Sequence, residues 1–139
     1  MHRRARTARI LAAAALAACA LTTAPAADAA PRPPAGSLFL TVSGADGELT
    51  GMARLDCDPA GGSHPLAAEA CTALRAADGN PDRLVAQRLV CTEEHAPVTA
   101  RVTGAWRGAP VNWSRTYPNA CHLRAATGTL FQFPAATGA

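Results

Sequence analysis

The chain has 139 residues, of which 49% are hydrophobic and 17% charged, and its formal net charge is +3. This length suits one small domain with a single core. Four of its thirteen cationic side chains stand at the extreme N-terminus (Arg3, Arg4, Arg6 and Arg9), so the rest of the chain is close to neutral. A near-neutral domain lacks the excess of basic side chains that binding to nucleic acid or to an anionic membrane surface requires, which excludes these two function classes.

The N-terminal arginines precede an apolar run over residues 10–21, and small residues follow that run. This layout is typical of an export signal, and the apolar run is too short to span a bilayer. Cleavage after Ala29 would give a signal peptide over residues 1–29 and a secreted protein. A second interpretation is a lipobox that ends at Cys19, in which case an acylated Cys19 would anchor the protein at the cell surface.

Residues 30–36, "APRPPAG", are rich in proline and carry no periodic pattern, which predicts a flexible N-terminal arm before a single domain over residues 37–139. Leu38, Leu40 and Val42 then alternate with more polar residues and predict a strand. After a turn at "GADGELTG", the same alternation resumes over residues 53–57.

Leu66, Ala70 and Leu74 are spaced four apart, which predicts a helix with Pro65 in its first turn and Gly79 at its end. A short second helix is predicted over residues 81–88. Period-two alternation over residues 98–106 and 111–117, joined by "RGAP", predicts a hairpin, and residues 130–133 predict a last short strand. Antiparallel strands covered on one face by one or two helices form an α+β sandwich.

The chain has five cysteines, and four remain if the signal peptide is removed. An even number in a small exported domain predicts two disulfides, in one of three pairings. The alternative is a zinc site, but Cys91 and His95 lack the paired short spacings of such sites. The sequence therefore predicts neither a metal nor a cofactor.

Two groups of residues carry candidate chemistry. Ser63 and His64 are neighbours in a loop of glycine and proline, without the sequence context of a catalytic triad, so no enzyme is predicted. Glu93 and Glu94 are adjacent, and neighbouring side chains on an extended segment point apart, which argues against an acid/base pair or a metal site shared with His95.

The simplest interpretation of "TEEHAP", residues 92–97, is a solvated loop tip. The segment is nevertheless constrained, because Cys91 fixes one end, Pro97 restricts the other, and a strand follows at once. These constraints favour a peptide that is presented to a partner.

Residues 57–74 read CDPAGGSHPLAAEACTAL. This stretch resembles the signature of the Streptomyces subtilisin inhibitor family: C-x-P, a glycine-containing spacer, G-x-H-P, four residues, A-C, and Leu three positions on. The resemblance extends over residues 37–133, in which like residues fall at Trp106-x-Gly108, Val111, Arg115, Asn119 and Phe131-x-Phe133.

The resemblance implies a five-stranded antiparallel sheet with two helices, a homodimer formed through the sheet, and bridges Cys57–Cys71 and Cys91–Cys121. It implies inhibition of a secreted serine endopeptidase by the standard mechanism, in which a loop binds like a substrate but is turned over extremely slowly.

The resemblance also places the scissile bond between Glu93 (P1) and Glu94 (P1′). The other loop residues expected to contact the protease are Val90, Cys91, Thr92 and His95. Asn119 and Pro97 are expected to support the loop, although Asn119 also suits a plain turn after Pro118. Family members usually carry Met or Lys at P1 and Pro at P2, so Glu93 and Thr92 depart from the pattern and favour a glutamate-selective protease.

Two other functions fit the same sequence. One is a binding or structural module of the cell envelope that inhibits nothing. The other is an inhibitor of a secreted metalloprotease, whose zinc Glu93, Glu94 and His95 would approach.

Overall fold

The computed structural model describes residues 21, 23–28, 30 and 32–134. The chain divides into two units, Met1–Pro31 and Arg32–Ala139, and the fold described below is that of the second unit. Cys19 and the cleavage position at Ala29 lie outside the described residues, so the signal peptide and the lipid anchor remain predictions. No helix within the described ranges is long and apolar enough to cross a membrane.

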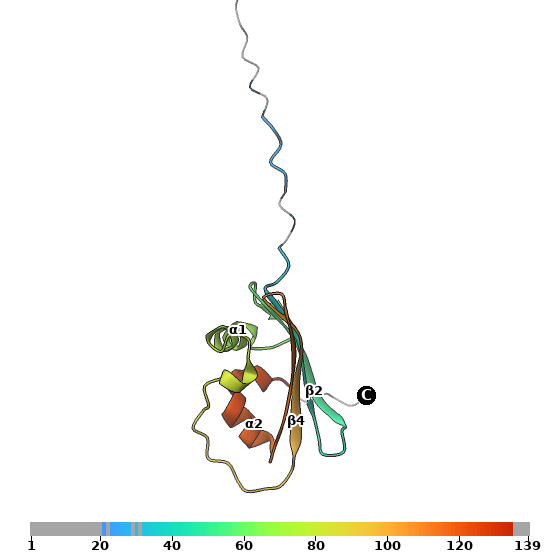
Figure 1. Cartoon of the computed structure of the whole chain (residues 1–139), viewed down its shortest axis with the longest axis vertical. Coiled ribbons are helices and arrows are strands. Elements are labelled where there is room, and N and C mark those ends of the chain that lie inside the picture. Colours follow the sequence, from blue (N-terminus) through green and yellow to red (C-terminus); the bar gives the residue numbers. More distant parts are fainter. Residues whose placement is uncertain (1–20, 22, 29, 31, 135–139) are drawn as a thin grey trace, which may run out of the picture. The chain divides into compact units, whose positions relative to one another are not determined.

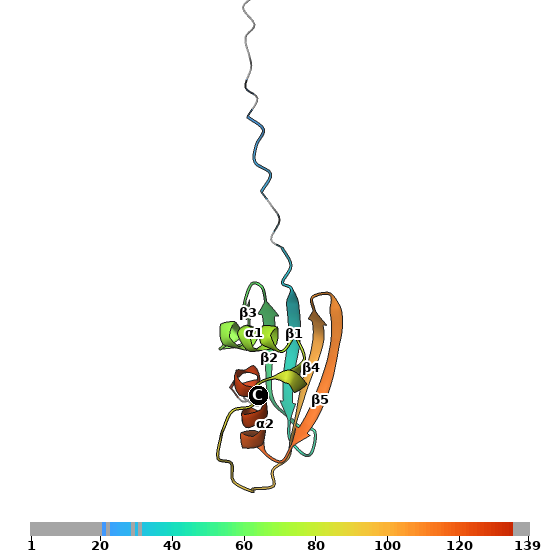
Figure 2. The ribbon, with the colours of Figure 1, turned by 60° about the vertical axis from the view of Figure 1, so that its left-hand side comes forward.

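Five antiparallel strands form one sheet in the order β3-β2-β1-β4-β5 (Figure 2). The strands are β1 (Gly36–Ser43), β2 (Leu49–Cys57), β3 (Gly61–Gly62), β4 (Val98–Trp106) and β5 (Ala109–Tyr117). β1 is central, and it pairs with β2 on one side and β4 on the other along its whole length. Its alternation has the predicted effect, because Leu38 and Leu40 are buried while Phe39 between them is 46% exposed.

Two α-helices, α1 (Ala67–Ala76) and α2 (Ala120–Thr127), cover the same face of the sheet (Figure 1). Two short 3-10 helices, η1 (Pro81–Arg83) and η2 (Gly128–Phe131), follow α1 and α2 along the chain. The predicted α+β sandwich, with its five-stranded sheet, two helices and two disulfides, is confirmed.

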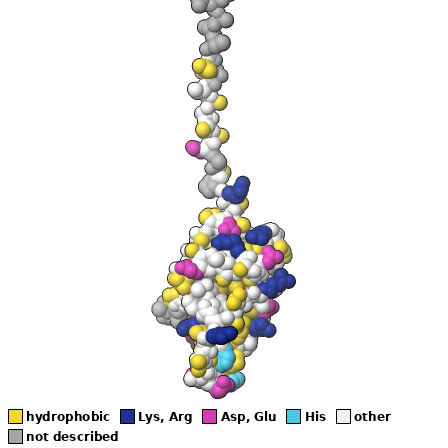
Figure 3. Space-filling view, turned by 90° about the vertical axis from the view of Figure 1, so that its left-hand side faces the viewer, with side chains coloured by type: hydrophobic (Ala, Val, Ile, Leu, Met, Phe, Trp, Pro, Cys, Tyr) yellow, Lys and Arg dark blue, Asp and Glu magenta, His cyan; other side chains and the backbone are white. Residues whose placement is uncertain are grey.

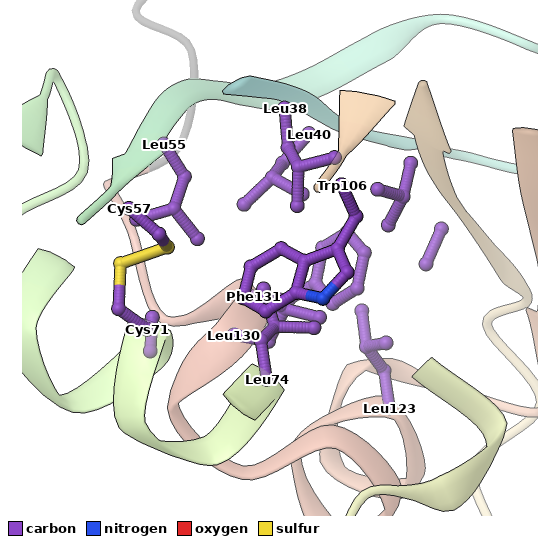
Figure 4. Close-up of a cluster of buried hydrophobic side chains, with 13 residues drawn as sticks. Leu38, Leu40, Leu55, Cys57, Cys71, Leu74, Trp106, Leu123, Leu130 and Phe131 are labelled. Atoms are coloured by element: carbon purple, nitrogen blue, oxygen red, sulfur yellow. A yellow bond between two sulfur atoms is a disulfide. The ribbon is translucent and has the colours of Figure 1, made fainter. Parts of the chain in front are cut away.

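The core lies between the sheet and the helices (Figure 4). Its largest members come from every layer of the fold: Leu38, Leu40, Leu55, Leu74, Val102, Trp106, Leu123, Leu130 and Phe131. Burying one such aliphatic side chain stabilises the fold by about 1.5–3 kcal/mol relative to leaving it exposed. Cys57 on β2 and Cys71 on α1 are both fully buried, and their disulfide closes this core.

The second helix is not where the sequence analysis placed it. The predicted helix over residues 81–88 is wrong, because only η1 forms there and Leu84 is already extended (φ −62°, ψ 144°). Leu84 packs against the core, and the backbone N–H of Gln87 donates to the carbonyl of Ala125 (2.7 Å) rather than to its own segment. Tertiary contacts therefore override a weak helical pattern.

The predicted strand over residues 130–133 is also wrong. Leu130 and Phe131 are adjacent and both buried, which a strand on one face of a sheet does not allow. They belong to η2, and the ring Nε2 of buried His64 lies 3.0 Å from the Leu130 carbonyl oxygen. The fifth strand is instead β3.

Two strands begin earlier than predicted. β1 starts at Gly36, inside the predicted arm, and β2 starts at Leu49, inside the predicted turn. Both extensions follow from the ladder itself, since Gly36 pairs with Cys57 and Ser43 with Leu49. Pairing partners, rather than local composition, set these ends.

Candidate functional site: a loop held by α2

The candidate loop covers residues 85–97, which have no regular secondary structure. Figure 1 shows it leaving η1, passing around α2 and returning to the start of β4. A free segment of this length would sample many conformations, so its shape depends on what holds it.

The middle of the loop is open to solvent. Residues 92–96 are all exposed, and so is Val90, whose relative exposure is 103%. Figure 3 shows acidic and histidine side chains gathered at the lower end of the molecule, where Figure 1 places the loop. An exposed apolar residue beside a charged tip is available to a partner without any rearrangement of the core.

A disulfide ties the loop to α2. Cys91 is bonded to Cys121, which lies in the first turn of the helix, with a Cα–Cα distance of 5.7 Å. Both cysteines are partly exposed. The two bridges are the pairs that the family resemblance implied.

Asn119 lies behind the loop, and only 6% of it is exposed. Its side-chain Nδ2 donates to the carbonyl oxygens of Thr92 (3.0 Å) and Glu94 (2.8 Å), which lie on either side of Glu93. Asn119 is also the N-cap of α2, because its Oδ1 accepts from the backbone N–H of His122 (3.1 Å). One side chain thus starts the helix and holds the loop.

Two further contacts hold the arms of the loop. The N–H of Ala96 donates to the carbonyl of Pro118 (3.0 Å), and the N–H of Gln87 donates to that of Ala125 (2.7 Å). Pro97 follows Ala96 and keeps it away from helical conformations, directly before β4 begins at Val98. The bridge and these hydrogen bonds all end on residues 118–125, so α2 and its N-terminal flank form one bracket for the loop.

The other chemical candidates have structural roles. The hydroxyl of Ser63 accepts from the N–H of Arg54 (2.9 Å), and the N–H of Leu66 donates to His64 Nδ1 (3.0 Å). Burial lowers the pKa of His64, and this effect exceeds the opposing influences of the Leu130 carbonyl and of Glu69. Across the described part of the chain, no three His, Cys, Asp or Glu residues are grouped so that they could hold a metal ion.

The structure brings together most of the residues that the sequence singled out. Val90, Cys91, Thr92, Glu93, Glu94 and His95 are consecutive on the loop, and Asn119 meets their backbone from across the fold. Sequence reasoning missed α2, and with it His122 and the Ala125 carbonyl. The signal was present, since Asn119 is a good N-cap residue, alanines follow it, and Gly128 with a φ of +58° ends the helix.

Comparison with known proteins gives concordant results. The model of the subtilisin inhibitor-like family matches residues 34–119. Protease inhibitor SIL-V2 of Streptomyces orinoci is 43% identical in an alignment of 103 residues, and the match covers 70% of this chain and 94% of the relative. The subtilase-type protease inhibitor of Streptomyces coelicolor is 40% identical in an alignment of 117 residues, and the match covers 80% of this chain and 78% of the relative.

The fold also matches a solved structure. In the crystal structure of Streptomyces caespitosus sermetstatin in complex with Bacillus licheniformis subtilisin, the matched chain is 30% identical, with a TM-score of 0.63. The match covers 70% of the present chain and 98% of that one.

Proposed function

The chain belongs to the subtilisin inhibitor-like family, and from this premise we propose that it inhibits a secreted serine endopeptidase by offering the Glu93–Glu94 peptide bond to the enzyme's active site. The relatives are named as protease inhibitors rather than as enzymes. In this proposal Val90, Cys91 and Thr92 occupy the subsites before the bond, and His95 lies beyond it.

The observation that carries the proposal is the pair of hydrogen bonds from Asn119 to the Thr92 and Glu94 carbonyls. They hold the backbone immediately before and immediately after Glu93, while the Glu93 side chain stays exposed. A plain solvated loop tip needs no such buried amide behind it.

Affinity in this arrangement comes from preorganisation. A flexible peptide loses conformational freedom when it docks against a protease, which lowers its affinity. Here the bridge and the hydrogen bonds from residues 118–125 have already restricted the loop. The backbone of Val90 to Thr92 can then add to a protease strand at little further entropic cost.

The same anchors explain resistance to hydrolysis. If the Glu93–Glu94 bond is cut, the upstream side remains attached through Cys91 and the downstream side through the Ala96–Pro118 hydrogen bond. The new amine therefore stays close to the acyl-enzyme at a high effective concentration. Religation is faster than departure, and the enzyme remains occupied.

The acidic residue at P1 selects the enzyme. An apolar specificity pocket would have to desolvate the Glu93 carboxylate at a cost of several kcal/mol, and each 1.4 kcal/mol is tenfold in affinity. A pocket with an aspartate, as in trypsin-like enzymes, would repel it. We therefore expect the target to be an endopeptidase that carries His or Arg in this pocket and cleaves after glutamate.

Titration of residues 30–139 against a glutamyl endopeptidase and a subtilisin tests the proposal. We expect tight inhibition of the first enzyme, weaker inhibition of the second, and one slow nick whose mass places it between Glu93 and Glu94. If neither enzyme is inhibited at micromolar concentration, the inhibitory function is wrong and a structural module is favoured. Inhibition of a secreted metalloprotease alone would favour that alternative instead.

The outer face of the sheet supports a homodimer as part of this proposal. Phe39 on β1 is 46% exposed and Met52 on β2 is 47% exposed, and each alternates along its strand with buried core residues, so both lie on the face of the sheet opposite the core. Covering these side chains with a second copy would remove apolar surface from water. Sedimentation of the wild type and of Phe39→Lys measures the assembly.

The proposed target also requires the protein outside the cell. Removal of residues 1–29 as an export signal would leave Ala30 at the mature N-terminus. The mass of the mature N-terminus distinguishes this product from one that is acylated at Cys19.

A further inference from the structure

We infer that His122 is a positioning residue for the Glu93–Glu94 bond, because its imidazole fixes the side-chain amide of Asn119 that holds the loop. The inference rests on the proposed function only for its link to protease resistance. The positioning itself concerns the free protein and is tested without any protease.

The side chain of Asn119 uses all of its hydrogen-bonding capacity. Nδ2 donates to the carbonyls of Thr92 and Glu94, while Oδ1 accepts from the His122 backbone N–H at 3.1 Å and lies 2.9 Å from the ring Nδ1 of His122. An asparagine amide has two N–H donors and an oxygen with two lone pairs, so four partners saturate it.

The chemistry of the pair assigns the proton. The amide oxygen only accepts, so the Nδ1 of His122 must carry a hydrogen and donate to it. Both the neutral Nδ1–H form and the cationic form of the ring satisfy this requirement.

The two donors of His122 determine which way the Asn119 amide faces. A flip by 180° would place Oδ1 against the Thr92 and Glu94 carbonyl oxygens and the NH2 group against the two N–H groups of His122. Because Asn119 is 6% exposed, little water is available to relieve those contacts. Without the imidazole, the backbone N–H of His122 is the one remaining donor to Oδ1 among these contacts. The side-chain amide of Asn119 then has more freedom to move.

The consequence for the loop is direct. Rotation of the amide moves Nδ2, from which both bonds to the backbone around Glu93 start, and the covalent anchor at Cys91 lies two residues away from Glu93. A looser backbone at the scissile bond holds the cleaved ends less well for religation. His122 thus affects how long the inhibitor resists cleavage, and it does so through Asn119 rather than by contact with the protease.

Two substitutions of nearly equal shape isolate the donor. His122→Asn keeps an N–H group at the position of Nδ1, whereas His122→Leu has the same branching but no donor. Both keep the backbone N–H that donates to the capping oxygen of Asn119. Arg124→Leu, at an exposed position of the same helix, is the matched control for added apolar surface.

The first measurement is hydrogen exchange of the Asn119 side-chain amide by NMR in the free protein. We expect His122→Leu to accelerate exchange about three- to tenfold, the range expected for loss of one net hydrogen bond. His122→Asn and Arg124→Leu should stay within about twofold of the wild type. If His122→Leu exchanges at the wild-type rate, or His122→Asn exchanges as fast as His122→Leu, the positioning role is wrong.

The second measurement is the rate at which a glutamyl endopeptidase nicks the loop, followed by mass. We expect the same ranking, with His122→Leu cleaved about three- to tenfold faster and His122→Asn close to the wild type. Faster amide exchange without faster nicking would overturn the link to protease resistance. If the wild type inhibits no protease, the proposed function fails, whereas the exchange measurement still decides the role of His122. His122→Phe replaces His122→Leu if the latter does not fold.

Discussion

The two disulfides of this protein lie in contrasting surroundings. Cys57 and Cys71 are 0% exposed and lie among the leucines that join the sheet to α1. Cys91 and Cys121 are partly exposed and join a segment without secondary structure to α2. The first disulfide and the apolar core therefore stabilise the same part of the fold together. The second disulfide and a few hydrogen bonds to residues 118–125 together hold the loop.

This difference separates two properties of the molecule. We expect the region around Cys57–Cys71 to determine the stability of the fold, because both cysteines belong to the buried core cluster. The region around Cys91–Cys121 determines the shape of the exposed loop, because little apolar surface is buried there. Changes in the loop should alter the partner but not the stability, and changes in the core should do the reverse.

The largest effect is expected from Glu93→Met. It removes the carboxylate that an apolar specificity pocket would have to desolvate, so affinity for subtilisin relative to a glutamyl endopeptidase should rise roughly a thousandfold. The melting temperature should change little, since the side chain is exposed. Inhibition constants and thermal unfolding measure both quantities.

Glu69→Met is the control for this exchange. Glu69 is exposed on α1, so the same chemical change there should leave both inhibition constants as they are in the wild type. If Glu93→Met and Glu69→Met rank the proteases alike, position 93 is not P1.

The next largest effects are expected from removing each disulfide by paired Cys→Ala substitutions, which should change stability in one region and inhibition in the other. Loss of Cys57–Cys71 should lower the free energy of unfolding by about 2–5 kcal/mol, while the protein that remains folded still inhibits. Loss of Cys91–Cys121 should leave the sheet and core folded but convert the loop into a substrate that is cut and released. Urea unfolding and the time course of inhibition distinguish the two results, and equal loss of inhibition per folded molecule in both variants would contradict the division.

The smallest effect concerns His64 and the pH dependence of stability. Burial lowers its pKa in the folded state below the ordinary value of 6.5, so the unfolded chain binds the additional proton first as the pH falls. Stability should therefore be full above pH 6.5 and decline below it, with a slope of at most about 1.4 kcal/mol per pH unit from this one group. The decline should stop once the folded protein also binds the proton.

Urea unfolding of the wild type and of His64→Gln between pH 5 and pH 8, a range of about three units around the histidine value, measures this slope. Gln retains an N–H for the Leu130 carbonyl but does not titrate, so its slope over this range should be smaller. The inhibition constant per folded molecule should change little, because His64 lies in the core rather than in the loop. Identical slopes would show that His64 does not cause the decline.

Local sequence patterns predicted the strands and the helix in which buried residues recur at a regular spacing. The alternation at Leu38 and Leu40 and the four-residue spacing of Leu66, Ala70 and Leu74 predicted β1 and α1. The start of α1 was predicted wrongly, because the helix begins at Ala67 with Leu66 as its N-cap, and Pro65 therefore lies outside its first turn. The same reasoning failed for residues 130–133, where buried neighbours belong to a 3-10 helix that closes the core. It failed again for residues 81–88, where only the short η1 forms and the N–H of Gln87 donates to the Ala125 carbonyl of α2.

The sequence by itself determined which faces are apolar, where the cysteines stand and which short peptide we propose as the inhibitory segment, because each of these follows from residue type and local spacing. Only the tertiary structure decided what lies behind that peptide. Thr92 and Asn119 are 27 positions apart, and they meet because the hairpin β4–β5 returns the chain to the start of α2. The contacts of Asn119 with the Thr92 and Glu94 carbonyls depend on this closure, and no local period encodes them.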